Sequence, residues 1–416
     1  MLEYNRIRAA AQNAEFYVLC ALVFVLPTLE TFKTILALVF VVTWLVGHYG
    51  GAREEVYSGA KLVGYSVLFL IFAAAVSTAI NWPMQSGLKG LKDTLFYSGV
   101  FLCLYRNGYS AKQKNIIAFC IVAGVLAGLL WGLVDVHSGK KVWLELRSVG
   151  IVTQSSIYLG MAIIIAFAMM VQGTAKEIAP QIFWAVSFGI MTIALFFMAS
   201  RGAIVATFAA LLLIVFCFRS WKFLLSAVLV MIVALALLVS SPDWMQQQRI
   251  VTKIQHYAQT WEIDANDNLR FTMWRIAAEQ FMYGGAMMFG IGPRNFPCID
   301  ISKLPLRDVT IQGKMCDHAH NLFLNKLVEE GIVGFIAMSL FFAVVVAALV
   351  ADFRKKRHGG WTWCAAVGAV VIPVIAGSFN TPWKQEHALL AMILIALFYA
   401  SRGPKASANH AETRHI

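Results

Sequence analysis

Charged residues are scarce in this sequence. Lysine, arginine, aspartate and glutamate make up 13% of its 416 residues, whereas hydrophobic residues make up 59% and the mean hydropathy is +0.70. The surface of a water-soluble domain needs far more charge, so this composition excludes a soluble globular protein. We therefore predict an all-α polytopic membrane protein.

Long apolar segments recur along most of the chain. A membrane-spanning helix needs about 20 mainly apolar residues, and we count about twelve candidate spans, some of them short. An even number of spans puts both termini on the same side. The first span lacks the small-x-small site of a cleavable signal. The candidates cover residues 15–29, 33–47, 62–80, 93–105, 115–134, 155–172, 181–199, 202–218, 222–240, 332–351, 361–378 and 386–401.

Basic residues in the short loops indicate the orientation. With the N-terminus in the cytoplasm, most lysines and arginines of the short loops are cytoplasmic. The exception is the loop of about residues 135–154, whose Lys140, Lys141 and Arg147 would be external. The expected division is then as follows: residues 1–240 hold the first nine spans, 241–331 a large external loop with helices, 332–402 the last three spans, and 403–416 a cytoplasmic tail.

The net charge of +12 does not indicate nucleic acid. No basic run with interleaved aromatic residues lies outside the membrane pattern, and charged cytoplasmic loops are the ordinary cause of such an excess. Basic residues on the outer side would instead lie near lipid headgroups. There they could meet a phosphorylated lipid substrate.

Only two of the seven cysteines lie outside the apolar segments and their borders. Cys20, Cys103, Cys120, Cys217 and Cys364 are expected to act as small hydrophobic residues. Cys298 and Cys316 lie in the large loop, where a disulfide would stabilise the fold by about 3 kcal/mol in an oxidising compartment. A bridge and two unpaired thiols remain equal alternatives.

The large loop carries two predicted helices before residue 290. The first covers residues 244–261. The second covers 269–283, after several N-capping candidates in Asp264–Asn268 and before Gly284 and Gly285. Arg270 would lie in its first turn and could bind an anion together with free backbone N–H groups, while Trp274 stacks on the guanidinium. The alternative is a solvated arginine that pairs with Asp267.

Gly290-Ile291-Gly292 is followed by Pro293 and Arg294. No strand–turn–helix context surrounds these glycines, so a nucleotide-binding loop is rejected. They indicate instead a tight turn where the backbone passes close to another segment, with Arg294 beside it.

A histidine pair, His318 and His320, stands directly after Asp317. A metal site is disfavoured because a third ligand would have to come from elsewhere and external carboxylates are few. Asn321–Gly331 reads as an amphipathic helix with Gly331 as its stop. His320 would precede this helix, where the positive end of the dipole keeps the imidazole neutral and able to accept a proton. A plain N-terminal capping histidine is the alternative.

Arg201, in Ser200-Arg201-Gly202, interrupts two apolar segments at their predicted external junction. An arginine at such a position is costly to keep there and is by default a functional candidate. A snorkelling turn residue is the alternative.

Taken in order, Ser200-Arg201-Gly202, the Arg270 helix, the Gly-x-Gly loop with Asn295 and Phe296, and His320-Asn321 running to Gly331 resemble the O-antigen ligase and polymerase superfamily of bacterial envelope glycosyltransferases. Pro293-Arg294 departs from the small residues usual in that loop. The resemblance implies a fold of the lipid-dependent glycosyltransferase (GT-C-like) type in the bacterial inner membrane, with the active site on the periplasmic face.

The resemblance also implies the reaction: transfer of a glycan from undecaprenyl diphosphate to a hydroxyl of lipid A-core, without metal, nucleotide or other cofactor. Displacement of diphosphate leaves negative charge, which a metal-free enzyme must neutralise with arginines, and the attacking hydroxyl needs a base. His320, Arg201 and Arg270 are the expected catalytic residues. The expected substrate-binding residues are Arg294, Asn321, His318, Arg147, Gln154 and Trp274.

A ligase ranks above an O-antigen polymerase, and a protein O-oligosaccharyltransferase ranks third because its relatives often carry a longer C-terminal region. From a different class, a lipid flippase or secondary transporter would place ionisable residues in the middle of several helices and often repeat its topology. Here most charge lies at helix ends.

Overall fold

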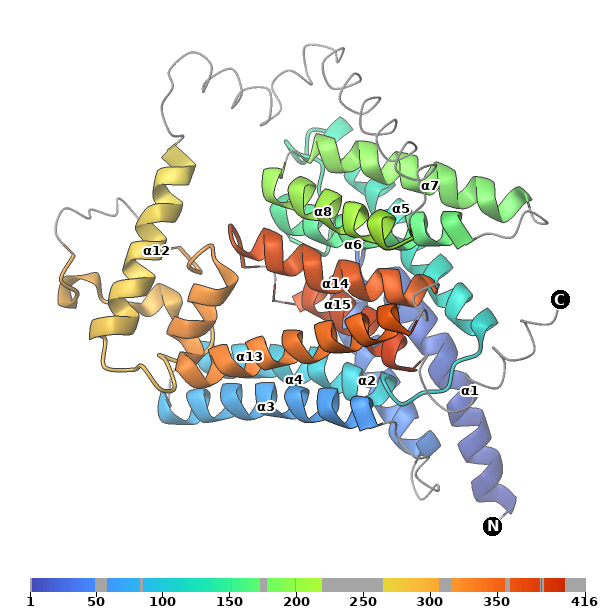
Figure 1. Ribbon diagram of the computed structural model, residues 1–416, viewed down its shortest axis with the longest axis horizontal. Coiled ribbons are helices and arrows are strands. Elements are labelled where there is room, and N and C mark those ends of the chain that lie inside the picture. The colour runs from blue at the N-terminus through green and yellow to red at the C-terminus, as the bar shows by residue number, and fades with distance from the viewer. Residues whose placement is uncertain are drawn as a thin grey trace.

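The computed structural model describes most of the chain, and every regular element in the described part is helical (Figure 1). The predicted segments 222–240 and 244–261 and the tail 403–416 lie outside the described residues. The residues described are 2–48, 58–82, 85–150, 152–172, 178–198, 200–218, 265–306, 316–355, 360–381, 383 and 385–400.

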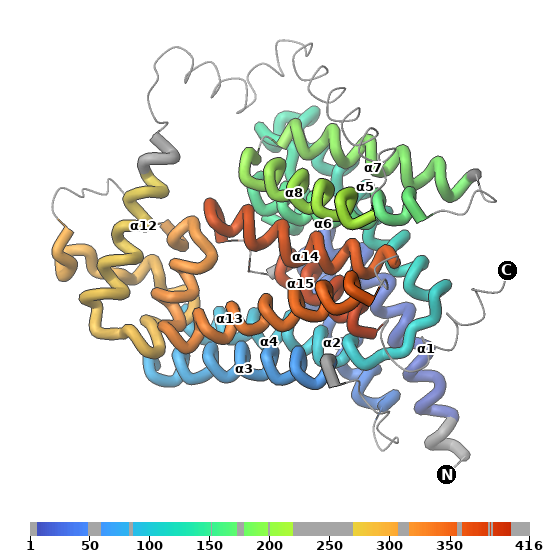
Figure 2. The backbone as a smooth tube through the Cα atoms, in the orientation of Figure 1, coloured from blue at the N-terminus to red at the C-terminus, as the bar shows by residue number. Residues whose placement is uncertain are grey.

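Twelve α-helices and two 3-10 turns occupy this part of the chain (Figure 2). The α-helices are α1 (Leu2–Val25), α2 (Glu30–His48), α3 (Ser58–Ile80), α4 (Gln85–Leu104), α5 (Ala111–His137), α6 (Val152–Gln172), α7 (Ile178–Phe197), α8 (Arg201–Phe218), α12 (Ala265–Tyr283), α13 (Leu322–Arg354), α14 (Trp361–Gly377) and α15 (Gln385–Ala400). The 3-10 turns are η1 (Phe296–Cys298) and η2 (Ile301–Lys303).

Each predicted span except 222–240 falls on one of these helices. In the described residues, seven helices are long and apolar enough to cross a membrane, namely α2, α3, α5, α6, α7, α8 and α13; α14 and α15 are apolar but shorter. The prediction of a polytopic all-α membrane protein is confirmed, although seven is fewer than the expected number of spans. The apolar segments 15–29 and 93–105 are parts of α1 and α4, whose first halves are polar.

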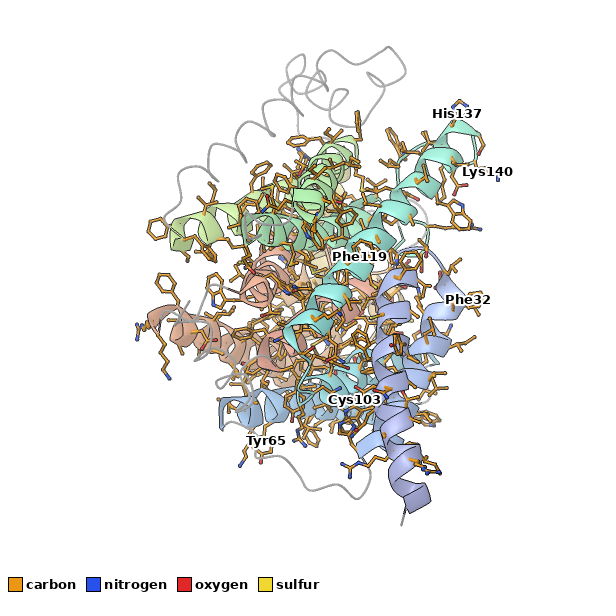
Figure 3. The ribbon with its side chains drawn as sticks, turned by 90° about the vertical axis from the view of Figure 1, so that its right-hand side faces the viewer. Phe32, Tyr65, Cys103, Phe119, His137 and Lys140 are labelled. Atoms are coloured by element: carbon orange, nitrogen blue, oxygen red, sulfur yellow. The ribbon has the colours of Figure 1, made fainter. Side chains whose placement is uncertain are left out.

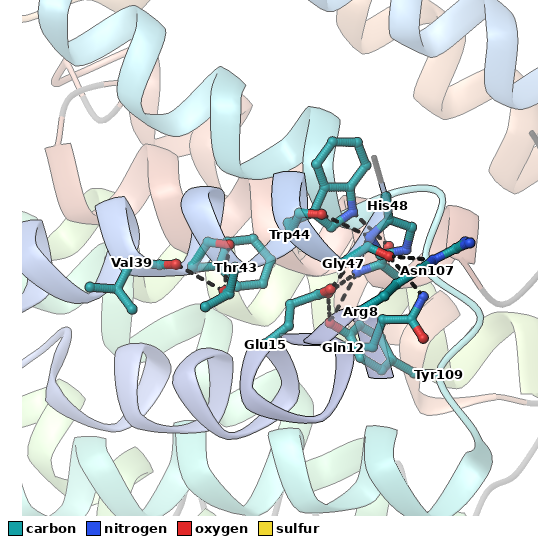
Figure 4. Close-up of polar contacts among 11 residues, drawn as sticks. Arg8, Gln12, Glu15, Val39, Thr43, Trp44, Gly47, His48, Asn107 and Tyr109 are labelled. Carbon is teal, nitrogen blue, oxygen red and sulfur yellow. Dashed lines mark hydrogen bonds and ion pairs between the residues drawn. The ribbon is translucent and has the colours of Figure 1, made fainter. Parts of the chain in front are cut away.

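The polar first half of α1 is helical because it packs on the end of α2 (Figure 4). The Arg8 and Gln12 side chains donate to the carbonyl of Gly47 at 2.9 and 3.0 Å. One turn further on, the buried Glu15 carboxylate accepts from the hydroxyl of Tyr109 at 2.8 Å and from the Asn107 amide. These polar contacts extend α1 well before the apolar segment that predicted it.

The centre of the bundle is formed by α6, α14 and α15, which pack against one another and bury most of their side chains. Outer helices keep apolar side chains exposed, among them Phe32, Tyr65 and Phe119; Phe32 and Tyr65 lie at the border of the protein in Figure 3. Exposed apolar side chains around a bundle are the expected surface of a protein whose solvent is lipid.

Helix α12 lies across the ends of the other helices, at the left of Figure 1, and packs on α13. Beneath it is a small separate core that joins α12, the η1–η2 segment and the start of α13. Its buried members are Met273, Ile276, Ala277, Phe296, Ile299, Leu304, Ala319 and Val328. We call this side of the molecule the α12 end.

Helix α13 breaks at Gly331, whose φ is +69° and ψ −167°. In an unbroken helix the N–H groups of Ile332 and Val333 would donate to the carbonyls of Val328 and Glu329. Here those N–H groups donate to Met287 and Met288 (2.9 and 3.2 Å), and the carbonyls accept from Ile291 and Gly292 (3.0 and 2.9 Å). The loop 287–292 thus satisfies the backbone groups that the break leaves open. The predicted stop at Gly331 is confirmed as a break, after which α13 continues as a span.

Replacing Gly331 with alanine is expected to destabilise the protein by about 1–3 kcal/mol. The left-handed φ strains any L side chain, and a Cβ would collide with the backbone of Met288. Thermal unfolding of the purified protein in detergent measures the change. Gly189→Ala on α7 is the matched control, because nothing lies within 4 Å of its Cβ position. Equal stability of the two variants would contradict this account of the break.

Candidate active site

The start of α13 is fixed by Asn321. As the N-cap, its side-chain oxygen accepts hydrogen bonds from the backbone N–H groups of Phe323 and Leu324, both at 3.0 Å. Its amide nitrogen donates to the carbonyl of Ser378, directly after α14, at 3.1 Å. Asn321 therefore caps one helix and ties it to the end of another, so its side chain is engaged at both ends.

His320 precedes this cap, as the sequence predicted. Its φ is +52°, in the left-handed region that non-glycine residues rarely occupy. On one side, the N–H of buried Ala319 donates to the Asn325 side chain at 3.1 Å; on the other side is the Asn321 cap. Its own carbonyl accepts from the indole N–H of Trp274 at 3.4 Å. The backbone around His320 is thus held from three directions.

The rings of His318 and His320 lie next to each other, with centroids 4.4 Å apart and an interplanar angle of 49°. Buried Ala319 separates them in sequence, so both side chains emerge on the same side of this anchor. Within the described part of the chain, no three His, Cys, Asp or Glu side chains come together as a metal-binding group. The pair can carry proton transfer, or one ring can orient the other.

Trp274 connects α12 to the end of α14. Its ring lies 6.3 Å from the ring of Phe379 and 5.4 Å, edge-on, from that of Phe271. Arg270 stands four residues before Trp274 and therefore on the same face of α12. It is not in the first turn, because α12 begins at Ala265; the predicted start was wrong since several N-capping residues precede residue 269. The predicted sharing of an anion with free N–H groups is therefore corrected.

Arg201 is the first residue of α8 and has an exposed side chain, at the junction predicted for it. The start of α8 lies against the end of α14: a Cβ on Gly202 would be 4.0 Å from the Ala376 Cα and from the Phe379 Cβ. The residues after α14, Ser378 and Phe379, are consequently touched from three helices. We call this meeting point the α14 junction.

Three elements that carry the predicted catalytic residues meet at the α14 junction. Asn321, next to His320, donates a hydrogen bond to Ser378. The ring of Trp274, on the same face of α12 as Arg270, lies near that of Phe379. Gly202, next to Arg201, lies close to Ala376 and Phe379. Two guanidinium groups and an imidazole on elements around one junction form a set suited to an anionic leaving group and a hydroxyl nucleophile. The sequence analysis did not identify Ser378 and Phe379 as part of the site. The one local signal was Gly377, which indicates that the apolar helix ends there.

Arg294 lies in the Gly-x-Gly loop, whose glycines have φ of +68° and +95°. The predicted close approach is confirmed: the carbonyl of Gly290 accepts from Asn81 at 3.0 Å, and a Cβ on Gly290 would collide with the backbone of Glu329. The Arg294 guanidinium forms an ion pair with Asp93 of α4 at 2.6 Å. Its main contact is thus within the protein, where it ties the loop to α4.

Charged side chains that sequence reasoning did not single out lie directly behind this ion pair. Lys326 and Glu330, one turn apart on α13, form a buried ion pair. Together with Asp93, Arg294 and Glu329 they line a small cavity of about 30 Å³, to which Thr381 and Trp383 contribute from the segment after α14. In the sequence, the i,i+4 spacing of Lys326 and Glu330 indicates that these two side chains can pair on a helix. No local pattern indicates that Asp93 of α4 lies beside them.

Arg147 and Gln154 flank the loop before α6. The Arg147 guanidinium lies 4.2 Å from the ring centroid of Trp131 on α5, and Gln154 is half-buried in the first turn of α6. Between them, the backbone and hydroxyl of Ser148 accept from the Lys33 ammonium at 3.4 and 3.0 Å, and that ammonium also pairs with Glu386 of α15. Their place in a substrate cavity stays a prediction.

Cys298 and Cys316 are both free thiols. Cys298 is exposed at the end of η1, whereas Cys316 packs at the edge of the small core beneath α12. Burial, with the nearby Asp317 carboxylate adding to it, raises the pKa of the Cys316 thiol.

Residues 186–339 match the family described as O-antigen ligase. The matched span runs from within α7 to within α13 and contains Arg201, Arg270 and His320. No curated protein matches the chain.

Breaking the ion pair between Asp93 and Arg294 is expected to destabilise the protein measurably. Asp93→Asn and Arg294→Gln should each lower the thermal unfolding temperature, because either one leaves a half-buried charge without its partner. The double variant should lose less than the sum, with a coupling of about 1 kcal/mol. Additive losses in this cycle would show that the pair does not hold the loop.

Proposed function

We propose that this polytopic membrane protein, whose residues 186–339 form an O-antigen ligase family domain, transfers a glycan from undecaprenyl diphosphate to a hydroxyl of lipid A-core. The protein lies in the inner membrane of a bacterium, and the α12 end faces the periplasm. The observation that carries the proposal is the α14 junction, where the elements bearing His320, Arg201 and Arg270 meet.

His320 is the general base of the proposed reaction. It accepts the proton of the acceptor hydroxyl while the hydroxyl oxygen attacks the anomeric carbon of the donor glycan. The bond from that carbon to the diphosphate oxygen breaks, and its electron pair leaves with undecaprenyl diphosphate. A single displacement of this kind inverts the anomeric centre. His318, whose ring adjoins that of His320, orients the base.

Arg201 and Arg270 stabilise the departing diphosphate. Arginine binds phosphate oxygens through two parallel N–H donors, which a lysine ammonium cannot reproduce. The two residues are on separate helices, so their guanidinium groups can approach the diphosphate from different sides. Asn321 acts in this scheme as a positioning residue, because its amide is engaged by the α13 backbone and Ser378. Arg294 holds the Gly-x-Gly loop.

Loss of the base is expected to abolish transfer. In cells that lack the native protein, wild type should restore the full lipopolysaccharide ladder on a gel, whereas His320→Ala should leave bare lipid A-core and let long lipid-linked glycans accumulate. Removal of a general base slows a reaction by about 10²–10⁴-fold. The variant must reach the membrane in wild-type amounts for this comparison.

The same gels separate the alternatives. A complete ladder with His320→Ala would refute the assigned base. Lipid A-core that carries a single repeat in cells lacking the protein would indicate a polymerase, and an unchanged profile would indicate protein glycosylation or transport instead.

Arg201→Lys is expected to fail in transfer even though it keeps the charge, because a planar two-donor group becomes a point charge. Transfer of a lipid-linked glycan to purified acceptor in detergent measures the effect, with a loss of about 10²-fold or more expected. Arg275→Lys on the exposed face of α12 is the matched control and should remain near wild type. Full activity of Arg201→Lys would remove this residue from the mechanism.

A further inference from the structure

The α12 end carries a group of exposed apolar side chains outside the middle of any span. Each is between 39% and 66% exposed. Apolar side chains that gather on a surface mark a contact with another apolar phase. We call this group the apolar rim; its members are Ile80 and Trp82 at the end of α3, Met282 and Tyr283 at the end of α12, and Met287 and Met288 in the following loop.

The rim lies at the level where α3 and α13 leave the bundle. The carbonyls of Met287 and Met288 accept from the first two N–H groups after the break at Gly331, where the spanning part of α13 begins. The same loop reaches the end of α3, since Asn81, next to Trp82, donates to the carbonyl of Gly290. Figure 1 shows the lower end of α12 leading through this loop to the ends of α3 and α13.

The surface just below the rim is the lipid-facing surface of the same helices. On α13, Ile336 and Leu340 are exposed one and two turns after the break, and on α3, Phe72 and Leu68 are exposed before the rim. The rim therefore continues a surface that the membrane already covers.

The chemistry of the segment fits that level of a bilayer. No charged residue stands between Glu279 and Arg294, in a chain whose charges otherwise collect at helix ends. Tryptophan and tyrosine, both present in the rim, are the side chains that concentrate at membrane–water interfaces. Methionine adds flexible apolar contact.

We propose that the apolar rim is buried in the interfacial region of the bilayer leaflet on the α12 side, in contact with phospholipid acyl chains. The rim then anchors the C-terminal end of α12 in the membrane. Because Arg270 and Trp274 are on this same helix, the anchor also sets their height above the membrane. The inference does not depend on the reaction that the chain catalyses.

Cysteine accessibility in pure phospholipid vesicles tests the proposal, because no other protein is present there to cover the rim. Cys298→Ser and Cys316→Ser first remove the two thiols outside the spans. Met288→Cys is then compared with Ser302→Cys in exposed η2 and with Leu340→Cys on the lipid face of α13. A charged maleimide that cannot cross membranes reacts only with thiolate in water.

We expect labelling of Ser302→Cys, none of Leu340→Cys, and labelling of Met288→Cys at least fivefold below that of Ser302→Cys; all three should react fully after denaturation. Equal labelling at 288 and 302 would overturn the proposal. So would a disulfide-linked dimer formed through Met288→Cys, which would assign the rim to a second copy of the chain. Trp82→Cys repeats the test on α3. If one of the two variants misfolds, the other can still refute the proposal.

Discussion

The exchange of backbone hydrogen bonds at Gly331 is the constraint on which the rest of this structure depends. Bilayer interior offers no water to satisfy open N–H and C=O groups, so a helix that breaks near the membrane must find partners for them within the protein. The loop 287–292 supplies partners on both sides of the break. It thereby fixes the C-terminal end of α12 to the start of the spanning part of α13, and the same loop continues to Arg294, which pairs with Asp93 of α4.

Buried and half-buried ion pairs join further parts of the fold. Arg294 joins the loop to α4, Lys326 and Glu330 stiffen the first segment of α13, and Lys33 joins α2 to α15 through Glu386. Such pairs contribute little net stability in a low dielectric, since the attraction mainly offsets desolvation. Breaking one of them is nevertheless costly, because an uncompensated charge stays behind. We infer that their effect is to favour one placement of α2, α4, α13 and α15 over shifted ones.

Local signals in the sequence predicted what depends on neighbouring residues. Apolar segments located the helices, Asn321 and Gly331 marked the bounds of the first part of α13, and two glycines indicated a close backbone approach. What depends on distant partners was not predictable: Asp93 lies far from Arg294 in sequence, and neither Ser378 nor Phe379 carries a pattern of its own. The start of α12 was misplaced because Asp264–Asn268 offers several competing caps. The polar first half of α1 had no apolar pattern and is helical through its contacts with Gly47 and Tyr109.

Backbone strain marks one residue of the proposed chemistry, His320, and one residue that holds the Gly-x-Gly loop, Arg294. Among the described residues, the non-glycine residues with positive φ are Arg294 and His320. Left-handed conformations of this kind persist only where surrounding contacts over-determine them. At His320 those contacts are the bond from Ala319 to Asn325, the bond from Trp274, and the Asn321 cap tied to Ser378. A capping histidine would need none of this, since Asn321 already fills the cap. These contacts fix the direction in which the His320 side chain leaves the main chain, and a fixed direction is what the general base proposed for this position requires.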